Sequence, residues 1–157
     1  TRSNCVTGVQ TCALPILNKI SGPLLDRIDI QVEITPVPFR DISKYSQGEP
    51  SAVIRERVIA ARRIQEERFK GFKGIYCNAQ MTERMIHQFA EPDEAGIELL
   101  RTAMERMSLS ARAYNRILKV ARTIADLDGS GCVLPHHLAE AINYRNLDRG
   151  DWAERGI

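Results

Sequence analysis

The sequence lacks the features of membrane proteins and of disulfide-rich secreted proteins. No apolar run approaches the roughly 18 to 20 residues that a membrane-spanning helix needs, so we expect no contact with a bilayer. Four cysteines in 157 residues are too few for the dense disulfide framework of a small secreted domain. The net charge is only +2, whereas nucleic-acid-binding domains usually have a pI above about 9. These absences leave an ordinary globular protein.

Several motifs with known chemistry are also missing. There is no G-x-x-x-x-G-K-[ST] phosphate loop, no G-x-G-x-x-G and no G-x-S-x-G. Cys77 and Cys132 lack the paired spacing of a zinc site. His136 and His137 are adjacent in the first turn of an expected helix and point in different directions, so we interpret them, with His87, as surface or boundary residues. The sequence therefore predicts no metal site.

The first sixteen residues differ in character from the rest of the chain. Their only charge is Arg2, and they show neither helical nor strand periodicity. The apolar part from Ala13 to Leu17 is too short for a signal peptide, and Pro15 interrupts it. The stretch from Val6 to Ile16 matches, in one frame, the translation of a constant short-read sequencing adapter. We therefore interpret residues 1–16 as a disordered, non-biological leader, and we expect the natural protein to be longer.

The other 141 residues carry a net charge of +1 and two cysteines, which favours a reducing cytoplasm. Apolar and polar residues alternate over Ile28–Ile34, the pattern of a half-buried strand, and Pro36 and Pro38 end it. Residues 39–50 read as a loop. Because a lone strand needs partners, we expect this one to belong to a sheet whose other strands lie outside the sequence.

Helical patterns fill the rest of the chain. We expect helices over 51–69, 82–90, 92–107, 110–127 and 135–144. Ser51 is the predicted N-cap of the first, and glycine at Asp128-Gly129 ends the fourth. The predicted apolar faces are Ile54, Val58, Ala61 and Ile64 in the first helix, Ile97, Leu100, Met104 and Met107 in the third, and Tyr114, Ile117, Leu118, Ala121 and Ala125 in the fourth.

Two arginines have settings that suit phosphate chemistry. Arg27 directly precedes the expected strand, where the end of a sheet can present it outward. Arg112 lies in the first turn of the helix over 110–127, where the positive helix end and a guanidinium fork both attract phosphate. Taken alone, either arginine is more often a solvated surface residue, so the pattern by itself assigns no function.

Four blocks carry a family resemblance: Ser21-GPLLDRIDIQVEI, Asn78-AQM, Leu109-SARAYNRILKVARTIADLDGS and His137-LAEAINYRNLDR. Together they resemble the C-terminal part of the magnesium chelatase-like AAA+ ATPases, and within them the bacterial ComM/YifB competence-protein group. The resemblance spans about Leu17 to Trp152, with the blocks in the right order. It implies a mainly α fragment of an α/β ATPase, in which residues 17–50 end the core with its last β-strand and residues 51–157 form a helical lid bundle.

The resemblance also implies an activity for the parent protein. Members bind ATP and Mg²⁺ through upstream Walker motifs, assemble as cytoplasmic homo-hexamers, and in the ComM branch act on DNA in natural transformation and branch migration. Arg27, in the LLDR motif, resembles the arginine finger that reaches a neighbouring subunit's ATP, and Asp26 is expected to orient its loop. Arg112, in SARAYNR, resembles the sensor 2 arginine; whether it acts in cis or in trans stays open. Without the Walker motifs the chain alone should be inactive.

Two alternatives remain. The parent could instead be a magnesium chelatase subunit of the porphyrin pathway. The chain could also be a non-enzymatic DNA-binding module, since Arg112, Arg116 and Lys119 recur at i, i+4 and i+7 and could contact phosphates. A solvated helix face explains the same spacing.

Overall fold

The computed structural model describes residues 24, 27–32, 34 and 48–145. The interpretation of residues 1–16 and the role of Asp26 lie outside this part. The described elements are α4 (Ser51–Arg68), the 3₁₀ turn η1 (Asn78–Gln80), α5 (Glu83–Phe89), α6 (Glu94–Met107), α7 (Ala111–Leu127) and α8 (Pro135–Asn143). The predicted mainly α character is confirmed. Within these residues no helix combines the length and the apolar character needed to cross a membrane.

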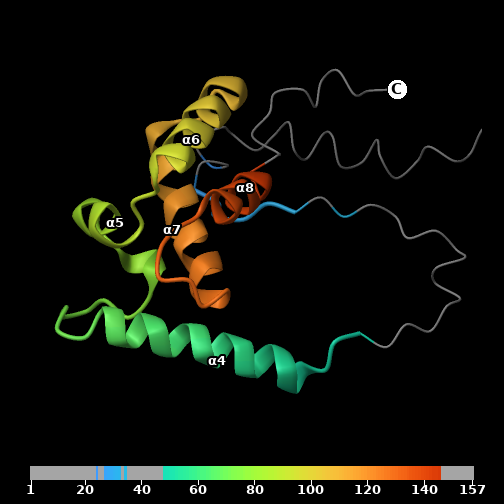
Figure 1. Cartoon of the computed structure of the whole chain (residues 1–157), viewed down its shortest axis with the longest axis vertical. Coiled ribbons are helices and arrows are strands. Elements are labelled where there is room, and N and C mark those ends of the chain that lie inside the picture. Colours follow the sequence, from blue (N-terminus) through green and yellow to red (C-terminus); the bar gives the residue numbers. More distant parts are fainter. Residues whose placement is uncertain (1–23, 25–26, 33, 35–47, 146–157) are drawn as a thin grey trace, which may run out of the picture.

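Helix α7 is the centre of the bundle. It runs between α5 and α8, and α4 crosses near its C-terminal end (Figure 1). Helix α6 packs on α8, and η1 packs on α7. The core formed between them consists of Phe69, Met81, Met85, Ile86, Ala90, Leu100, Met107, Ile117, Leu118, Ala121, Val133, Leu138, Ala141 and Ile142. Every helix therefore depends on α7 or on α8, its neighbour, for burial.

The helix bounds, the glycine end and four of the five predicted apolar residues of α7 match the prediction, and the fifth, Tyr114, is half-buried. Ser110 is the N-cap, and its hydroxyl accepts a hydrogen bond from the Ala113 N–H at 3.2 Å. Ile117, Leu118, Ala121 and Ala125 are buried. The helix ends at Asp128, and Gly129 follows with φ +70°, a left-handed conformation that glycine adopts without steric cost.

Helices α6 and α8 approach each other closely because of one glycine. A Cβ on Gly96 would lie 2.7 Å from Leu138 Cδ1 of α8 and 2.8 Å from Pro92 Cβ. Helix α6 begins two residues later than predicted, since Pro92 lies just before the N-cap Asp93. The Asp93 carboxylate accepts from the Gly96 N–H at 2.8 Å. Of the predicted stripe, Leu100 and Met107 are buried and Met104 is half-buried, whereas Ile97 is exposed, so the stripe was correct only in part.

The predicted apolar face of α4 was largely wrong. Only Ala61 of its four residues is buried, while Ile54, Val58 and Ile64 are exposed. Helix α4 contacts the bundle through its C-terminal half, and its N-terminal half extends away from the other helices (Figure 1). The predicted cap was also wrong, because Pro50 occupies the N-cap position of α4.

The strand predicted over Ile28–Ile34 is not formed in residues 28–32 and 34, which pair with no other strand in the described part of the chain. All four alternating apolar residues are exposed, and Ile34 is 86% exposed. Gln31, between them, is buried, and its N–H donates to the Tyr144 carbonyl at the end of α8. Because a ladder requires a second strand, the alternation alone could not produce one here.

The two serines near helix starts give a matched test of capping. We expect Ser110→Ala to lower the free energy of unfolding by about 1 kcal/mol, because the Ala113 N–H loses its acceptor. Ser51→Ala should have a much smaller effect, since Ser51 is not the N-cap of α4. Chemical denaturation of both variants measures the difference, and equal losses would contradict the assignment.

Candidate functional site

A groove of about 620 Å³ lies along α7, between the segment that contains Asp29 and the end of α8. The α7 side of the groove includes Arg112, Arg116 and Lys119. Asp29 and Ile30 line it from the N-terminal segment, and Glu140 and Tyr144 line it from the α8 side. The groove thus brings together parts of the chain that are far apart in sequence, with three cationic side chains along one helix.

The two arginines singled out from the sequence are both exposed to solvent. Arg112 lines the groove from the first turn of α7. Arg27 lies in the segment that leads into the groove, where its backbone N–H donates to the Leu24 carbonyl at 3.0 Å. Neither guanidinium forms a hydrogen bond or ion pair with another residue of the described part. Both are therefore free to bind an anionic group.

The other two cations of the groove are already engaged. Arg116 forms an ion pair with Asp29, and the Lys119 ammonium donates to the Ala79 carbonyl at 2.9 Å. Burial and the nearby charge of Arg116 lower the pKa of Lys119 below its usual value. These bonds hold the walls of the groove together and leave Arg112 as its uncommitted cation.

Two further bonds fasten the N-terminal segment to the end of α8. The Gln31 N–H donates to the Tyr144 carbonyl at 2.8 Å. The fully buried Arg145 donates through Nη1 to the Ile28 carbonyl, also at 2.8 Å. The segment that follows Arg27 is thereby held against α7 and the end of α8 by its backbone as well as by the Asp29 side chain.

A buried polar network joins α4, η1 and α7, and the sequence reasoning missed it. Asp126 has a fully buried side chain that accepts from both terminal nitrogens of Arg68, one at 2.7 Å. Asn78 Nδ2 donates to the same carboxylate at 2.8 Å, and Arg122 Nε donates at 3.1 Å. Arg122 also donates to the carbonyl oxygens of Ser130 and Gly131. One carboxylate thus anchors three elements.

The electrostatics of this network favour the charged carboxylate. Burial alone would raise the pKa of Asp126, but the hydrogen bonds from Arg68 and Asn78 and the charge of Arg122 outweigh it, so the pKa lies below its usual value. A sequence signal did exist: Arg122 and Asp126 are four residues apart on the same stripe as Ile117, Leu118, Ala121 and Ala125, where unpaired charges are not tolerated.

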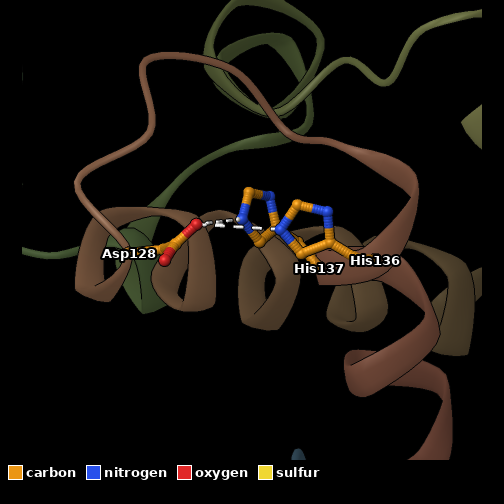
Figure 2. Close-up of side chains that lie close together, drawn as sticks. All are labelled: Asp128, His136 and His137. Atoms are coloured by element: carbon orange, nitrogen blue, oxygen red, sulfur yellow. Dashed lines mark hydrogen bonds and ion pairs between the residues drawn. The ribbon is translucent and has the colours of Figure 1, made fainter.

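The prediction for the paired histidines was correct only in placing His136 at the surface. His136 and His137 do not diverge: both rings approach Asp128, and their centroids are 4.0 Å apart (Figure 2). His137 is also not a surface or boundary residue, because its side chain is 1% exposed, whereas that of His136 is 65% exposed. The ligand atoms of this triad lie within 4.8 Å of one another.

The hydrogen bonds of His137 nevertheless work against a metal ion. The Leu134 N–H donates to His137 Nδ1 at 3.0 Å, so in the neutral ring the proton lies on Nε2. Nε2 then donates to Asp128 Oδ2 at 3.2 Å, and no lone pair remains for a metal. His137 therefore serves as a cap for α8 that is tied to the end of α7, and its bond lowers the pKa of Asp128.

Comparison with known proteins identifies the class to which this bundle belongs. Residues 48–145 match the family model described as magnesium chelatase, subunit ChlI C-terminal. Since the match covers more than half of the chain, the chain belongs to this family. The resemblance inferred from the four sequence blocks is thereby confirmed.

Particular relatives refine this placement. Competence protein ComM of Haemophilus influenzae is 40% identical over 134 residues, which are 85% of this chain and 25% of that protein. The uncharacterized protein YifB of Escherichia coli is 42% identical over 147 residues, which are 93% of this chain and 28% of that protein. YifB of Salmonella typhimurium is 40% identical over the same length. The chain spans about a quarter of the length of these relatives.

Proposed function

We propose that this chain is the C-terminal lid of an AAA+ ATPase, in which Arg27 is the arginine finger and Arg112 the sensor 2 arginine. The observation that supports this most strongly is the groove. It lies where the segment after Arg27 meets the helix that carries Arg112 in its first turn, and neither guanidinium group forms a bond with another described residue. The family membership of residues 48–145 supports the same role.

The chemistry assigned to the two arginines is electrostatic. Bound ATP with its Mg²⁺ would supply the phosphoryl group, and the upstream core would hold it. Arg112 presents its guanidinium from the positive end of α7, a position that suits a phosphate. Arg27 presents a second fixed cation, which stabilises negative charge on a transferring phosphoryl group in a neighbouring subunit.

The outward row of apolar side chains fits the same proposal. Ile28, Ile30, Val32 and Ile34 are exposed, while Gln31 faces the lid. A sheet in the upstream core would cover this row and complete the predicted strand, which would place Arg27 at the end of that sheet. Residues 17–50 would then be the end of the core and residues 51–157 the lid.

The biological setting follows from the names of the relatives. ComM is a competence protein, so we propose that the parent is a cytoplasmic homo-hexamer that uses ATP and Mg²⁺ to process DNA, with branch migration in natural transformation as its role. The family name also contains magnesium chelatase, which keeps a porphyrin-pathway subunit as the alternative. The separate DNA-binding module is less well supported, because Arg116 and Lys119 are engaged within the chain.

A chimera tests the proposal directly. Residues 17–157 would replace the corresponding C-terminal part of E. coli YifB, and ATP hydrolysis would be measured for the chimera, for YifB and for this chain alone. We expect the chimera to hydrolyse ATP and the chain alone to be inactive. If Arg112→Ala in the chimera hydrolyses ATP at the original rate, the sensor assignment is contradicted. The matched control is Arg106→Ala, on the exposed surface of α6.

A further inference from the structure

The segment that follows Arg27 is fastened to the lid by residues for which the proposed function has no role so far. Asp29 pairs with Arg116 across 87 positions of sequence, and Arg145 reaches the Ile28 carbonyl across 117 positions. The third bond joins the Gln31 N–H to the Tyr144 carbonyl. Two of the three bonds use backbone groups of the segment, so they fix its path and not only one side chain.

The positions of Asp29 and Arg116 relative to the two free arginines are informative. Asp29 follows Arg27 by two residues, a separation of at most about 7 Å along the chain. Arg116 follows Arg112 by one helical turn, so the two lie on the same face of α7 about 6 Å apart. The ion pair therefore joins a residue two positions after Arg27 to a residue one helical turn after Arg112, across the groove.

We propose that Arg116, through Asp29, is a positioning residue that makes Arg27 and α7 move as one unit. This inference rests on the proposed function and adds a regulatory element to it. A shift of α7 when Arg112 meets a phosphate would be passed through the ion pair to Arg27. The nucleotide sensed by the lid would thereby set whether the finger is presented to the adjacent subunit.

Exposure determines how strong this link is. The Arg116 side chain is 27% exposed and that of Asp29 is 52% exposed, so the pair is screened by solvent and contributes modestly. The buried Arg145 and the Gln31 backbone bond keep the segment close to the lid when the pair breaks. The Arg116–Asp29 ion pair can therefore break and re-form while the hydrogen bonds of Arg145 and Gln31 keep the segment in place. A contact of this kind can couple two groups.

Hydrogen exchange of the Gln31 amide in this chain tests the contact. We expect Arg116→Glu to speed exchange about three- to tenfold, because repulsion from Asp29 loosens the segment. The exchanged pair Asp29→Arg with Arg116→Asp should restore slow exchange. Arg106→Glu, the same charge reversal on the exposed surface of α6, is the matched control and should leave exchange unchanged. Exchange that does not respond to Arg116→Glu, or is not restored by the exchanged pair, overturns the proposal.

Kinetics of the YifB chimera test the coupling itself. We expect Arg116→Glu to lower kcat about ten- to hundredfold, because a displaced finger is poorly aligned, while KM for ATP changes less than about twofold. The exchanged pair should recover kcat, a rescue that a merely structural role would not show. If Arg27→Ala is inactive but Arg116→Glu keeps a normal kcat, the coupling inference is overturned and the proposed function stands. If Arg27→Ala keeps normal turnover, the proposed function itself is overturned.

Discussion

Arg27→Ala in the YifB chimera is expected to lower ATP turnover about 10³-fold or more. The guanidinium is exposed and forms no bond within the described part of the chain, so its removal should disturb no folded structure. The proposed role of the guanidinium is to stabilise negative charge that develops in the transition state of phosphoryl transfer. A fixed cation contributes most to the stability of that transition state. ATP affinity should therefore change less than about twofold, as measured by nucleotide titration alongside steady-state hydrolysis.

Two variants sharpen this expectation. Arg27→Lys keeps the charge but loses the planar fork, so it should recover only part of the activity. A mixture of Arg27→Ala chimeras with chimeras that carry an inactivated Walker A lysine should recover some turnover, because the finger acts on a neighbouring subunit. Full activity of Arg27→Ala would exclude the finger role, and absence of recovery in the mixture would exclude its action between subunits.

Asp126→Asn is expected to cost about 3 to 5 kcal/mol of unfolding free energy, the usual cost of breaking a buried ion pair from one side. The substitution leaves Arg122, which is almost fully buried, and Arg68, with a side chain 12% exposed, without their carboxylate. The matched control is Glu98→Gln, which makes the same carboxyl-to-amide change in an Arg101 pair on the surface. Chemical denaturation should show a large loss for the first variant and almost none for the second.

The pH dependence of stability provides a second measurement. The folded pKa of Asp126 lies below its usual value, so the unfolded state binds the proton more readily. The stabilisation is therefore complete above the unfolded pKa of about 3.9 and is lost as the pH falls through the lower folded pKa. The original chain should lose stability below about pH 4, and Asp126→Asn should lose less over the same range. An equal loss in both would show that Asp126 does not carry this dependence.

Some of the fold could be predicted because its signals are local. Four of the five predicted apolar residues of α7 and the glycine after Asp128 lie within one continuous segment, and both predictions are confirmed for them. Pro135 likewise begins α8 as predicted, because its fixed φ suits the first helical position. The roles of Arg27 and Arg112 that the family resemblance implied stay predictions.

The burial of α4 and the pairing of the expected strand could not be predicted, because both depend on which elements pack together. Ile54 and Val58 of α4 have the spacing of a buried face, yet they stay exposed because only the C-terminal half of the helix reaches α7. The Ile28–Ile34 alternation is typical of a strand, but it has no partner strand in the described residues. Spacing shows which side chains share a face, and it does not show whether another element covers that face.

Sequence patterns alone indicated the family, the order of the helices and the two arginines that are proposed to meet a phosphate. The tertiary structure was needed to show that Asp126 pairs with Arg68 and Arg122, and that Asp29 pairs with Arg116. It also showed that the buried His137 connects α8 to the end of α7. The two kinds of interaction differ in the sequence separation over which they act. Helix caps and periodicity act over a few residues, whereas the pairing of a buried charge depends on the partner that folding brings from 58 or 87 positions away.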